Sequence, residues 1–549
     1  MFGKALLLLT TIALYALFLV QPINLSTADL GRHIQNGEIF LTTGTIPQGN
    51  FYSYTFPDSD FVNHHWGTGV LFALAHRIGG FDALSILFLL FSIGTLVLAF
   101  DTARRLSSFR VALLTTVFFL PLVTSRTEIR PEVFSYFLTL LFLWMLVRFR
   151  AGDLSKNWIL FGLPALELIW VNLHIYFPFG ILLIGIFLAE SLIGAIRRYE
   201  VNRPTPTTFQ HSAECWNVVG RKKSLEQTYI LGIAIVASLS ITLINPLGLT
   251  GAFYPFHIFS DYGYPLLENQ PAWKIESLIP YPPALSFKIA FGGLVLSWIL
   301  AAIRVIRHEA MLPVAPLLLT LGFGWLGWSA VRNFAHFGYV MLPVVARNID
   351  IFFTSPLLPR AGFKRTPEIN RRKSSFITGI LALCIFLGVI LSNPTYFQSK
   401  NSMGVGLAPG VNSAAQFFKT NGIKGPLFNN YDVGGYLIYH LYPEERVFVD
   451  NRPEAYPAEF FTQTYIPMQE RNEKWYQVSA EYRFNTIFFN RRDLTPWGQQ
   501  FLVSRVQDPE WAPVFADGYH TIFLRRGGPN QSVIDQFEIP QSAFSITER

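Results

Sequence analysis

Long apolar segments recur through the N-terminal part of this chain, and they limit the folds that it can adopt. A helix that crosses a bilayer needs about 17–25 mainly apolar residues, because the hydrocarbon core offers no partner to a free backbone group. Only 14% of the residues are charged, against about 25% in a typical soluble domain. We therefore predict a polytopic α-helical membrane protein with about eleven transmembrane helices. The segments lie near residues 4–23, 81–100, 111–125, 133–149, 157–173, 176–196, 228–245, 287–303, 310–330, 333–347 and 375–393.

The positions of the basic residues predict which loops share a side of the membrane, since cytoplasmic loops are rich in Lys and Arg. The apolar segment 66–80 is short for a span, and counting it as one would move every later basic loop to the outer side. We therefore predict that it is a helix in the outer interface. Topology then accounts for the formal charge of +7, and we expect no nucleic-acid partner. The basic clusters predicted to lie inside are at 104–110, 148–156, 197–223, 304–307 and 360–373.

The predicted outer loops hold ionisable side chains near the helix ends. Arg126, Arg130 and Arg332 lie on the side where arginine is disfavoured, which makes them candidates for function. Carboxylates occur in the same loops, at Asp29, Glu128, Glu132 and Glu268.

The stretch "NLSTADLGRHIQNGEIFLTTG" (24–44) follows the first apolar segment and opens a large outer loop, 24–80. If 28–41 is helical, Asp29, Arg32, His33 and Asn36 share one face, while Leu30, Ile34 and Leu41 lie on another. We predict a short amphipathic helix on the membrane surface. Ser26 and Asp29 also resemble a capping box, so a purely structural role for Asp29 is an alternative.

The composition changes after Leu391, and residues 395–549 read as a soluble domain. The spacing predicts a helix ended by Gly422, a strand in "GPLFNN", a helix in "GGYLIYHL", strands in "RVFVDNR" and "NTIFFN", and a hairpin turning at Asp517-Gly518. Strands that alternate with helices indicate a small parallel or mixed α/β sheet. The predicted division is a transmembrane domain, 1–394, and an extracytoplasmic α/β domain, 395–549.

A catalyst of sugar transfer at a membrane surface needs three things that these loops can supply. It needs a carboxylate base for the acceptor, cations for a phosphate leaving group and, in some enzymes, a metal held by oxygen ligands. Composition and topology carry the inference this far.

The order of the motifs resembles the GT-C superfamily of integral-membrane glycosyltransferases, which includes aminoarabinose transferases and protein O-mannosyltransferases. The motifs are similar to those of a largely uncharacterised bacterial branch with an Asp-x-x-x-His…Gly pattern in the first loop. In this chain they are "ADLGRHIQNGEIFLTTGTIPQGNFYSYT", "VNHHWGTGVLFAL", "IRPEVFSY", "WVNLH", "INPLG" and "GGYLIYHLYPEERVFVDNRPEAY". The branch usually has His-Glu-Trp where this chain reads His64-His65-Trp66, which leaves metal dependence open.

The resemblance implies a hexosyl- or pentosyl-transferase of the cell envelope, multi-pass in the cell membrane. It would move a sugar from a polyprenyl-phosphate donor to a glycan, lipid or protein acceptor. Asp29 would be the base or a metal ligand; an opposite charge would lower its pKa and burial would raise it. The donor phosphate would bind Arg32, Arg126, Arg130 and Arg332. The supporting residues would be His33, His64, His65, Glu128, Glu132, Asn172, His174 and Glu268, and a divalent metal, if used, would bind Asp29, His65 and Glu132.

Structural interpretations stay open beside these roles. Asn172 and His174 can simply end a helix, and Glu268 can pair with Lys274 on the surface. Asp450 and Arg452 can form an internal salt bridge. The alternative at the level of function is a non-enzymatic carrier or assembly factor for lipid-linked glycans, or a GT-C fold without activity whose outer domain binds a glycan or a partner.

Overall fold

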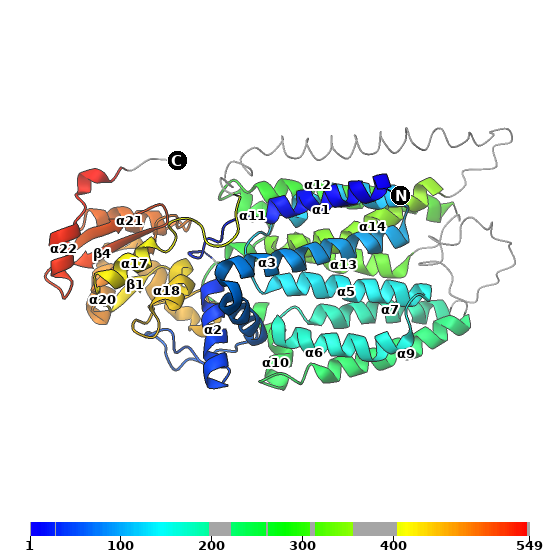
Figure 1. Ribbon diagram of the computed structural model, residues 1–549, viewed down its shortest axis with the longest axis horizontal. Helices are drawn as coiled ribbons and strands as arrows, with labels where there is room; N and C mark the ends of the chain where they lie inside the picture. Colours follow the sequence, from blue (N-terminus) through cyan, green and yellow to red (C-terminus); the bar gives the residue numbers. More distant parts are fainter. Residues whose placement is uncertain are drawn as a thin grey trace.

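The computed structural model describes residues 2–27, 29–196, 221–259, 262–307, 313–354 and 403–545. A bundle of long helices forms one part of the molecule, and an α/β domain sits at one end of that bundle (Figure 1). The predicted boundary at 394/395 lies outside the described residues.

Helices account for every predicted span that the structure describes. Among the described residues, α3, α5, α7, α9 and α12 are long and apolar enough to cross a membrane, and four shorter apolar helices accompany them. Ten of the eleven predicted segments coincide with helices; the eleventh, 375–393, lies outside the described residues. The helices of this part are α1 (Phe2–Leu19), α2 (Leu30–Thr43), α3 (Trp66–Leu106), α4 (Phe109–Val123), α5 (Glu132–Ala151), η1 (Trp158–Gly162), α6 (Leu163–Leu173), α7 (Pro178–Ile196), α9 (Arg221–Ile241), α10 (Leu249–Phe253), η2 (Tyr254–Phe259), η3 (Leu267–Asn269), α11 (Ala272–Glu276), α12 (Pro282–Ile306), α13 (Val314–Ser329), η4 (Val331–Asn333) and α14 (Phe334–Thr354).

A break inside α3 separates the short apolar segment from the span that follows it. Gly79 and Gly80 leave helical geometry, and Gly80 has φ +61° and ψ −148°, a conformation that glycine adopts far more readily than other residues. The arm before the break packs on α2, where a Cβ at Gly37 would clash with the carbonyl of Gly69. Figure 1 shows α2 lying across the ends of the bundle helices. Helices are therefore present at both predicted places, 28–41 and 66–79, with α2 beginning two residues later, while their position in the membrane interface stays a prediction.

The α/β domain contains a four-stranded mixed sheet in the order β1-β2-β4-β3. The pair β1 and β2 is parallel, with Phe428 beside Ile487, and the other two pairs are antiparallel. The predicted mixed sheet and hairpin are thus confirmed. The elements are α17 (Ser413–Thr420), β1 (Leu427–Asn429), η5 (Tyr431–Val433), α18 (Gly434–Leu441), η6 (Pro453–Ala455), η7 (Phe460–Tyr465), α19 (Ile466–Glu470), α20 (Asn472–Tyr482), β2 (Thr486–Asn490), α21 (Gly498–Val506), β3 (Trp511–Ala516), β4 (His520–Arg525), α22 (Gln531–Phe537) and η8 (Gln541–Ala543).

The strand predicted in "RVFVDNR" is wrong. This segment joins no sheet, and Val447 forms a single parallel bridge with Ser53 of the first loop. Its backbone exchanges hydrogen bonds with Tyr52 and Tyr54 there. The apolar alternation that reads as a strand reflects burial between the two parts of the chain.

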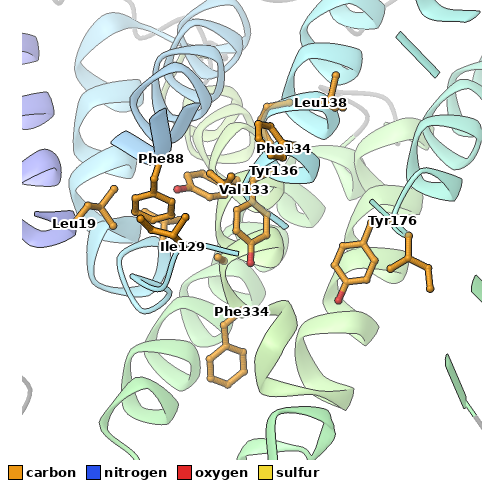
Figure 2. Packing of buried hydrophobic residues seen from close by; sticks show 14 of the residues in the cluster. Leu19, Phe88, Ile129, Val133, Phe134, Tyr136, Leu138, Tyr176 and Phe334 are labelled. Atoms are coloured by element: carbon orange, nitrogen blue, oxygen red, sulfur yellow. The ribbon is translucent and has the colours of Figure 1, made fainter. Parts of the chain in front are cut away.

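Two apolar cores support the region where the parts meet. In the bundle, Leu19 of α1, Phe88 of α3, Phe134 of α5 and Phe334 of α14 belong to one buried apolar cluster (Figure 2). In the α/β domain a second cluster of aromatic side chains packs around Phe428. Because both cores reach the first loop, that loop is held from both sides.

A buried ion pair fastens the first loop to the α/β domain. Arg452 Nε donates to Asp450 Oδ1 at 2.7 Å, and both side chains are buried. Arg452 Nη2 also donates to Asn50 Oδ1 of the first loop at 2.6 Å, and Asn50 Nδ2 donates to the Ala455 carbonyl. The internal salt bridge considered for Asp450 and Arg452 is therefore present.

Asp450→Asn should destabilise the protein by about 3–5 kcal/mol, because it leaves the Arg452 guanidinium buried without its counter-charge. Denaturant-induced unfolding of the purified protein would measure the change. Glu538→Gln is the matched control, since the Arg526–Glu538 pair is 40% exposed on each side and its loss should cost at most about 1 kcal/mol. Equal effects of the two substitutions would contradict the fastening role.

Candidate functional site

A cavity of about 400 Å³ opens where the first loop, the bundle end and the α/β domain meet. It collects residues from loops far apart in sequence, so the predicted outer loops share one end of the bundle. The polar side chains that line it are Thr27, Asp29, Arg32, His64, His65, Arg130, Glu132, His174, Glu268, Asn269, Arg332, Asp432, Asn451, Glu454, Asn490, Arg492 and Thr495, with Tyr254, Tyr262, Tyr264 and Tyr431.

Asp29 lies directly before α2 and turns its carboxylate toward the first helical turn. Asp29 Oδ2 is 3.3 Å from Arg32 Nη2 and 3.4 Å from His33 Nε2. Its Oδ1 atom has no hydrogen-bond partner among the described residues. The predicted shared face is therefore formed, although His33 and Asn36 are buried behind the cavity wall, where Asn36 accepts a hydrogen bond from Tyr52.

The capping alternative for Asp29 is not what the structure shows. Asp29 is the N-cap residue of α2, but its side chain makes no capping hydrogen bond. The Ser26 hydroxyl has no hydrogen-bond partner either among the described residues, so the capping box is not formed. The helix holds Asp29 in place through its first turn and leaves one carboxylate oxygen unused.

The charges around Asp29 keep it ionised. Burial alone raises the pKa of Asp29, but the hydrogen bond with His33 and the positive charges of Arg130 and Arg32 lower that pKa by more, to well below its ordinary value. A carboxylate with a low pKa is a weak proton acceptor, but it is a constant negative charge at physiological pH. Asp29 is thus suited to stabilise a positive charge that develops in the cavity.

Glu268 joins the outer arginines into one network. Its Oε2 atom accepts from Arg126 at 3.2 Å and from Arg130 at 3.0 Å, and its Oε1 lies 3.9 Å from Arg332. Burial raises the pKa of Glu268, but Arg130, Arg332 and Arg126 lower it by more, so that the net shift is downward. Glu268 therefore pairs with these arginines, not with Lys274 as the surface alternative required.

The arginines differ in how fully their donors are used. Arg126 does not line the cavity, and its guanidinium is held by Glu132 at 2.7 Å and by Glu268. Arg130 lines the cavity but is also bound to Glu128 at 2.7 Å. Arg332 donates to Asn269 at 2.8 Å, and its Nε has no hydrogen-bond partner among the described residues. Of these three, Arg332 therefore has the most capacity left for an incoming anion.

Histidine rings form a packed row beside Asp29. His65 stacks on His174 with the ring centroids 4.8 Å apart, and its ring lies edge-on to those of His64 and His33. His174 is fixed by a 2.8 Å hydrogen bond between its Nδ1 and the Ser135 hydroxyl. Burial lowers the pKa of each of these histidines, so the row is neutral near pH 7.

Acidification should destabilise the protein through this row. Burial lowers the pKa of His64 to about 3, while an unfolded histidine has a pKa of about 6.5. The unfolded state therefore binds more protons between these values, and stability should fall as pH decreases from about 6.5 to 3, by at most about 1.4 kcal/mol per pH unit for one histidine. His64→Gln should flatten this dependence in unfolding measurements made across the range. His257→Gln, at an exposed position, should leave it unchanged; an identical slope in all three proteins would contradict the prediction.

Two other predicted site residues lie outside the cavity. Glu128 accepts a hydrogen bond from Arg130, and Asn172 links the ends of three helices. Asn172 Oδ1 accepts from Trp66 Nε1 at 2.9 Å, and its Nδ2 donates to the carbonyls of Leu168 and Ile244. The helix-ending interpretation fits Asn172, whereas His174 lines the cavity.

The three residues named for a metal are not gathered into a metal-binding group. Within the described ranges no set of three or more His, Cys, Asp or Glu side chains is arranged to hold an ion. Glu132 is engaged by Arg126, and Asp29 by Arg32 and His33. We therefore assign no step to a metal.

The α/β domain supplies one wall of the cavity, and sequence analysis missed it. Asn490 is the last residue of β2, and Asp432 and Thr495 follow the carboxyl ends of the parallel strands β1 and β2. Ligands of α/β sheets bind outside the carboxyl ends of strands. This rule could have found them from "LFNNYD" and "IFFNRRD", but the facing of these ends toward Asp29 has no sequence signal.

No known family model matches the sequence, and no curated protein matches it. Three solved structures of oligosaccharyltransferases of Archaeoglobus fulgidus, one of them named AglB, are similar in fold. The complex with an inhibitory peptide and a dolichol-phosphate is 11% identical, covers 95% of this chain and 74% of that chain, and has a TM-score of 0.55. The form tethered to an acceptor peptide (12%, 93% and 73%, TM-score 0.56) and the apo form (12%, 93% and 74%, TM-score 0.52) are also similar.

At this identity the likeness shows the fold alone. It extends over most of the chain, bundle and α/β domain together, and it agrees with the predicted architecture of an apolar helical bundle joined to an α/β domain. Membership of the GT-C superfamily, and of the bacterial branch within it, stays a prediction.

Proposed function

We propose that this protein is a membrane glycosyltransferase that moves a sugar from a polyprenyl-phosphate donor to an acceptor at the outer face of the cell membrane. The observation that carries the proposal is the shared cavity, in which an ionised carboxylate, Asp29, lies near a set of arginines at one end of an apolar bundle. The AglB complex with a dolichol-phosphate supports a lipid-linked donor. The α/β domain would then be extracytoplasmic.

The leaving phosphate and the anomeric centre develop opposite charges during the reaction, so each needs a protein charge of the opposite sign. The anomeric carbon bonds to the acceptor nucleophile while its bond to the phosphate oxygen breaks, and polyprenyl phosphate leaves. Arg332 and Arg130, with Arg32, would stabilise the negative charge that grows on the leaving phosphate. Asp29 would stabilise the positive charge that grows at the anomeric centre, as a carboxylate does in glycoside hydrolysis.

The alternative, a non-enzymatic carrier of lipid-linked glycans, requires ionisable groups inside the bundle. Glu167 of α6 is such a group, since it is buried and neither carboxylate oxygen has a hydrogen-bond partner among the described residues. The polar side chains that line the cavity nevertheless gather at the bundle end, which favours the enzyme.

Purified protein in lipid nanodiscs separates the two functions. With a labelled polyprenyl-phosphate sugar and mixed acceptors, an enzyme releases polyprenyl phosphate and forms a labelled glycoside. In sealed liposomes a carrier moves the same donor across the bilayer without any chemical change. Transport without release would overturn the proposal.

A further inference from the structure

Two aspartates of the α/β domain stand together where its parallel strands end at the cavity. Asp432 lies in η5, just after β1, and Asp493 follows β2. Because β1 and β2 are parallel neighbours, their carboxyl ends meet at one edge of the sheet. Asp432 lines the cavity, and Asp493 is buried behind it.

The two carboxylates are held differently. Asp493 Oδ1 accepts from the Thr495 backbone N–H at 2.8 Å, and Oδ2 accepts from Asn430 Nδ2 at 2.8 Å. Asp432 makes no hydrogen bond and no ion pair with any other described side chain, so its carboxylate is free to contact a molecule in the cavity. Asp493 is therefore held in place by its neighbours, whereas the Asp432 carboxylate is the member of the pair that is open to the cavity.

The surroundings of Asp432 favour proton uptake. Burial and the charge of Asp493 raise its pKa to about 7, against the opposing effect of Arg130. The charges of Glu128 and Glu268, which belong to loops of the bundle, raise its pKa further. A carboxyl with this pKa is matched to proton transfer at neutral pH, whereas the pKa of Asp29 in the same cavity is shifted the other way.

We propose that Asp432 is a second catalytic residue, which takes the proton from the hydroxyl or amine of the acceptor, with Asp493 as a positioning residue. This inference rests on the proposed function. As the acceptor oxygen or nitrogen bonds to the anomeric carbon, its X–H bond breaks and the proton passes to Asp432. The electron pair of the glycosyl–oxygen bond leaves with polyprenyl phosphate. The protonated Asp432 then returns its proton to water.

The first test compares Asp432→Asn with the wild type in the transfer assay. The variant should bind polyprenyl phosphate as the wild type does but transfer sugar about 10²–10⁴-fold more slowly. The wild-type rate should rise with pH through about 7, and the residual rate of the variant should lack this rise. Asp432→Glu should restore part of the rate and keep the rise.

The second test uses the neighbour. Asp493→Asn removes the charge that opposes ionisation of Asp432, so the rise in rate should move to lower pH while transfer persists. If that variant does not fold, the profiles of Asp432→Asn and Asp432→Glu decide alone. Three results would overturn the inference. They are an Asp432→Asn rate within threefold of the wild-type rate, a rate of Asp432→Asn that rises with pH as the wild-type rate does, and a loss of donor binding in Asp432→Asn as large as its loss of rate. Absence of transfer in the wild type itself would instead overturn the proposed function.

Discussion

Asp29→Asn protein should fold, bind its donor and transfer almost no sugar, with a rate about 10²–10⁴-fold below the wild type. This range is typical for loss of a positioned general base or of a preorganised charge at the reacting centre. Asn keeps the size of the side chain but removes its charge and its basicity. Because the Asp29 side chain makes no capping hydrogen bond, the start of α2 should be little affected.

The control is Asp58→Asn, an exposed position in the same loop and away from the cavity, which should transfer at the wild-type rate. The assay follows release of polyprenyl phosphate by purified protein, and a melting curve checks the fold. Wild-type transfer by the Asp29→Asn protein would show that Asp29 is not catalytic. The pH dependence of the residual activity distinguishes a base role for Asp29 from a purely electrostatic one. If Asp432 is the proton acceptor and Asp29 acts only by its charge, the residual rate of Asp29→Asn should still rise near pH 7. If Asp29 is the base, that rise should be lost.

Arg332→Gln should weaken donor binding by about 10–100-fold, since a hydrogen bond to a charged group contributes about 1.5–3 kcal/mol. Of Arg126, Arg130 and Arg332, it is Arg332 whose donors are least occupied, and its side chain is 18% exposed. Arg332→Lys should recover part of the affinity, because the charge returns without the planar fork. Titration with a fluorescent polyprenyl phosphate would give these affinities.

Two further arginines serve as controls for that titration. Arg77→Gln disrupts an exposed pair with Glu38 away from the cavity and should leave donor affinity unchanged. Arg126 does not line the cavity, and Arg126→Gln removes an ion-pair partner of Glu132 and Glu268. It should therefore lower the stability of the fold more than the affinity for the donor. If Arg77→Gln weakens binding as much as Arg332→Gln, the arginines act only through overall charge.

The parts of the fold that sequence could predict are those with a local signal. Apolar length located the helices, and the period of Leu30 and Ile34 located α2. The distribution of basic loops predicted that the loops of Asp29, Arg130, Glu268 and Arg332 lie on the same side, and the structure places these residues at one end of the bundle. The strand predicted in "VFVD" was wrong because the apolar alternation there comes from packing against the first loop at Ser53. Periodicity alone does not distinguish such packing from pairing in a sheet.

Sequence predicted only those site residues that the loops of the bundle contribute. The contacts of Glu268 with Arg126, Arg130 and Arg332 depend on the meeting of loops more than 60 residues apart in sequence. Asp432 was not predicted as a site residue, because nothing in "NNYDVGG" indicates which surface the end of β1 faces. The closure of the cavity by the α/β domain is a tertiary fact, set by contacts such as Arg452 with Asn50.

A cryo-electron microscopy structure of the protein bound to a non-hydrolysable polyprenyl-phosphate sugar tests the central claim most directly. The account predicts phosphate density within hydrogen-bond distance of Arg332 and Arg130, with the sugar between Asp29 and Asp432. Density for the donor elsewhere on the bundle, with the cavity unoccupied at saturating donor, would contradict it.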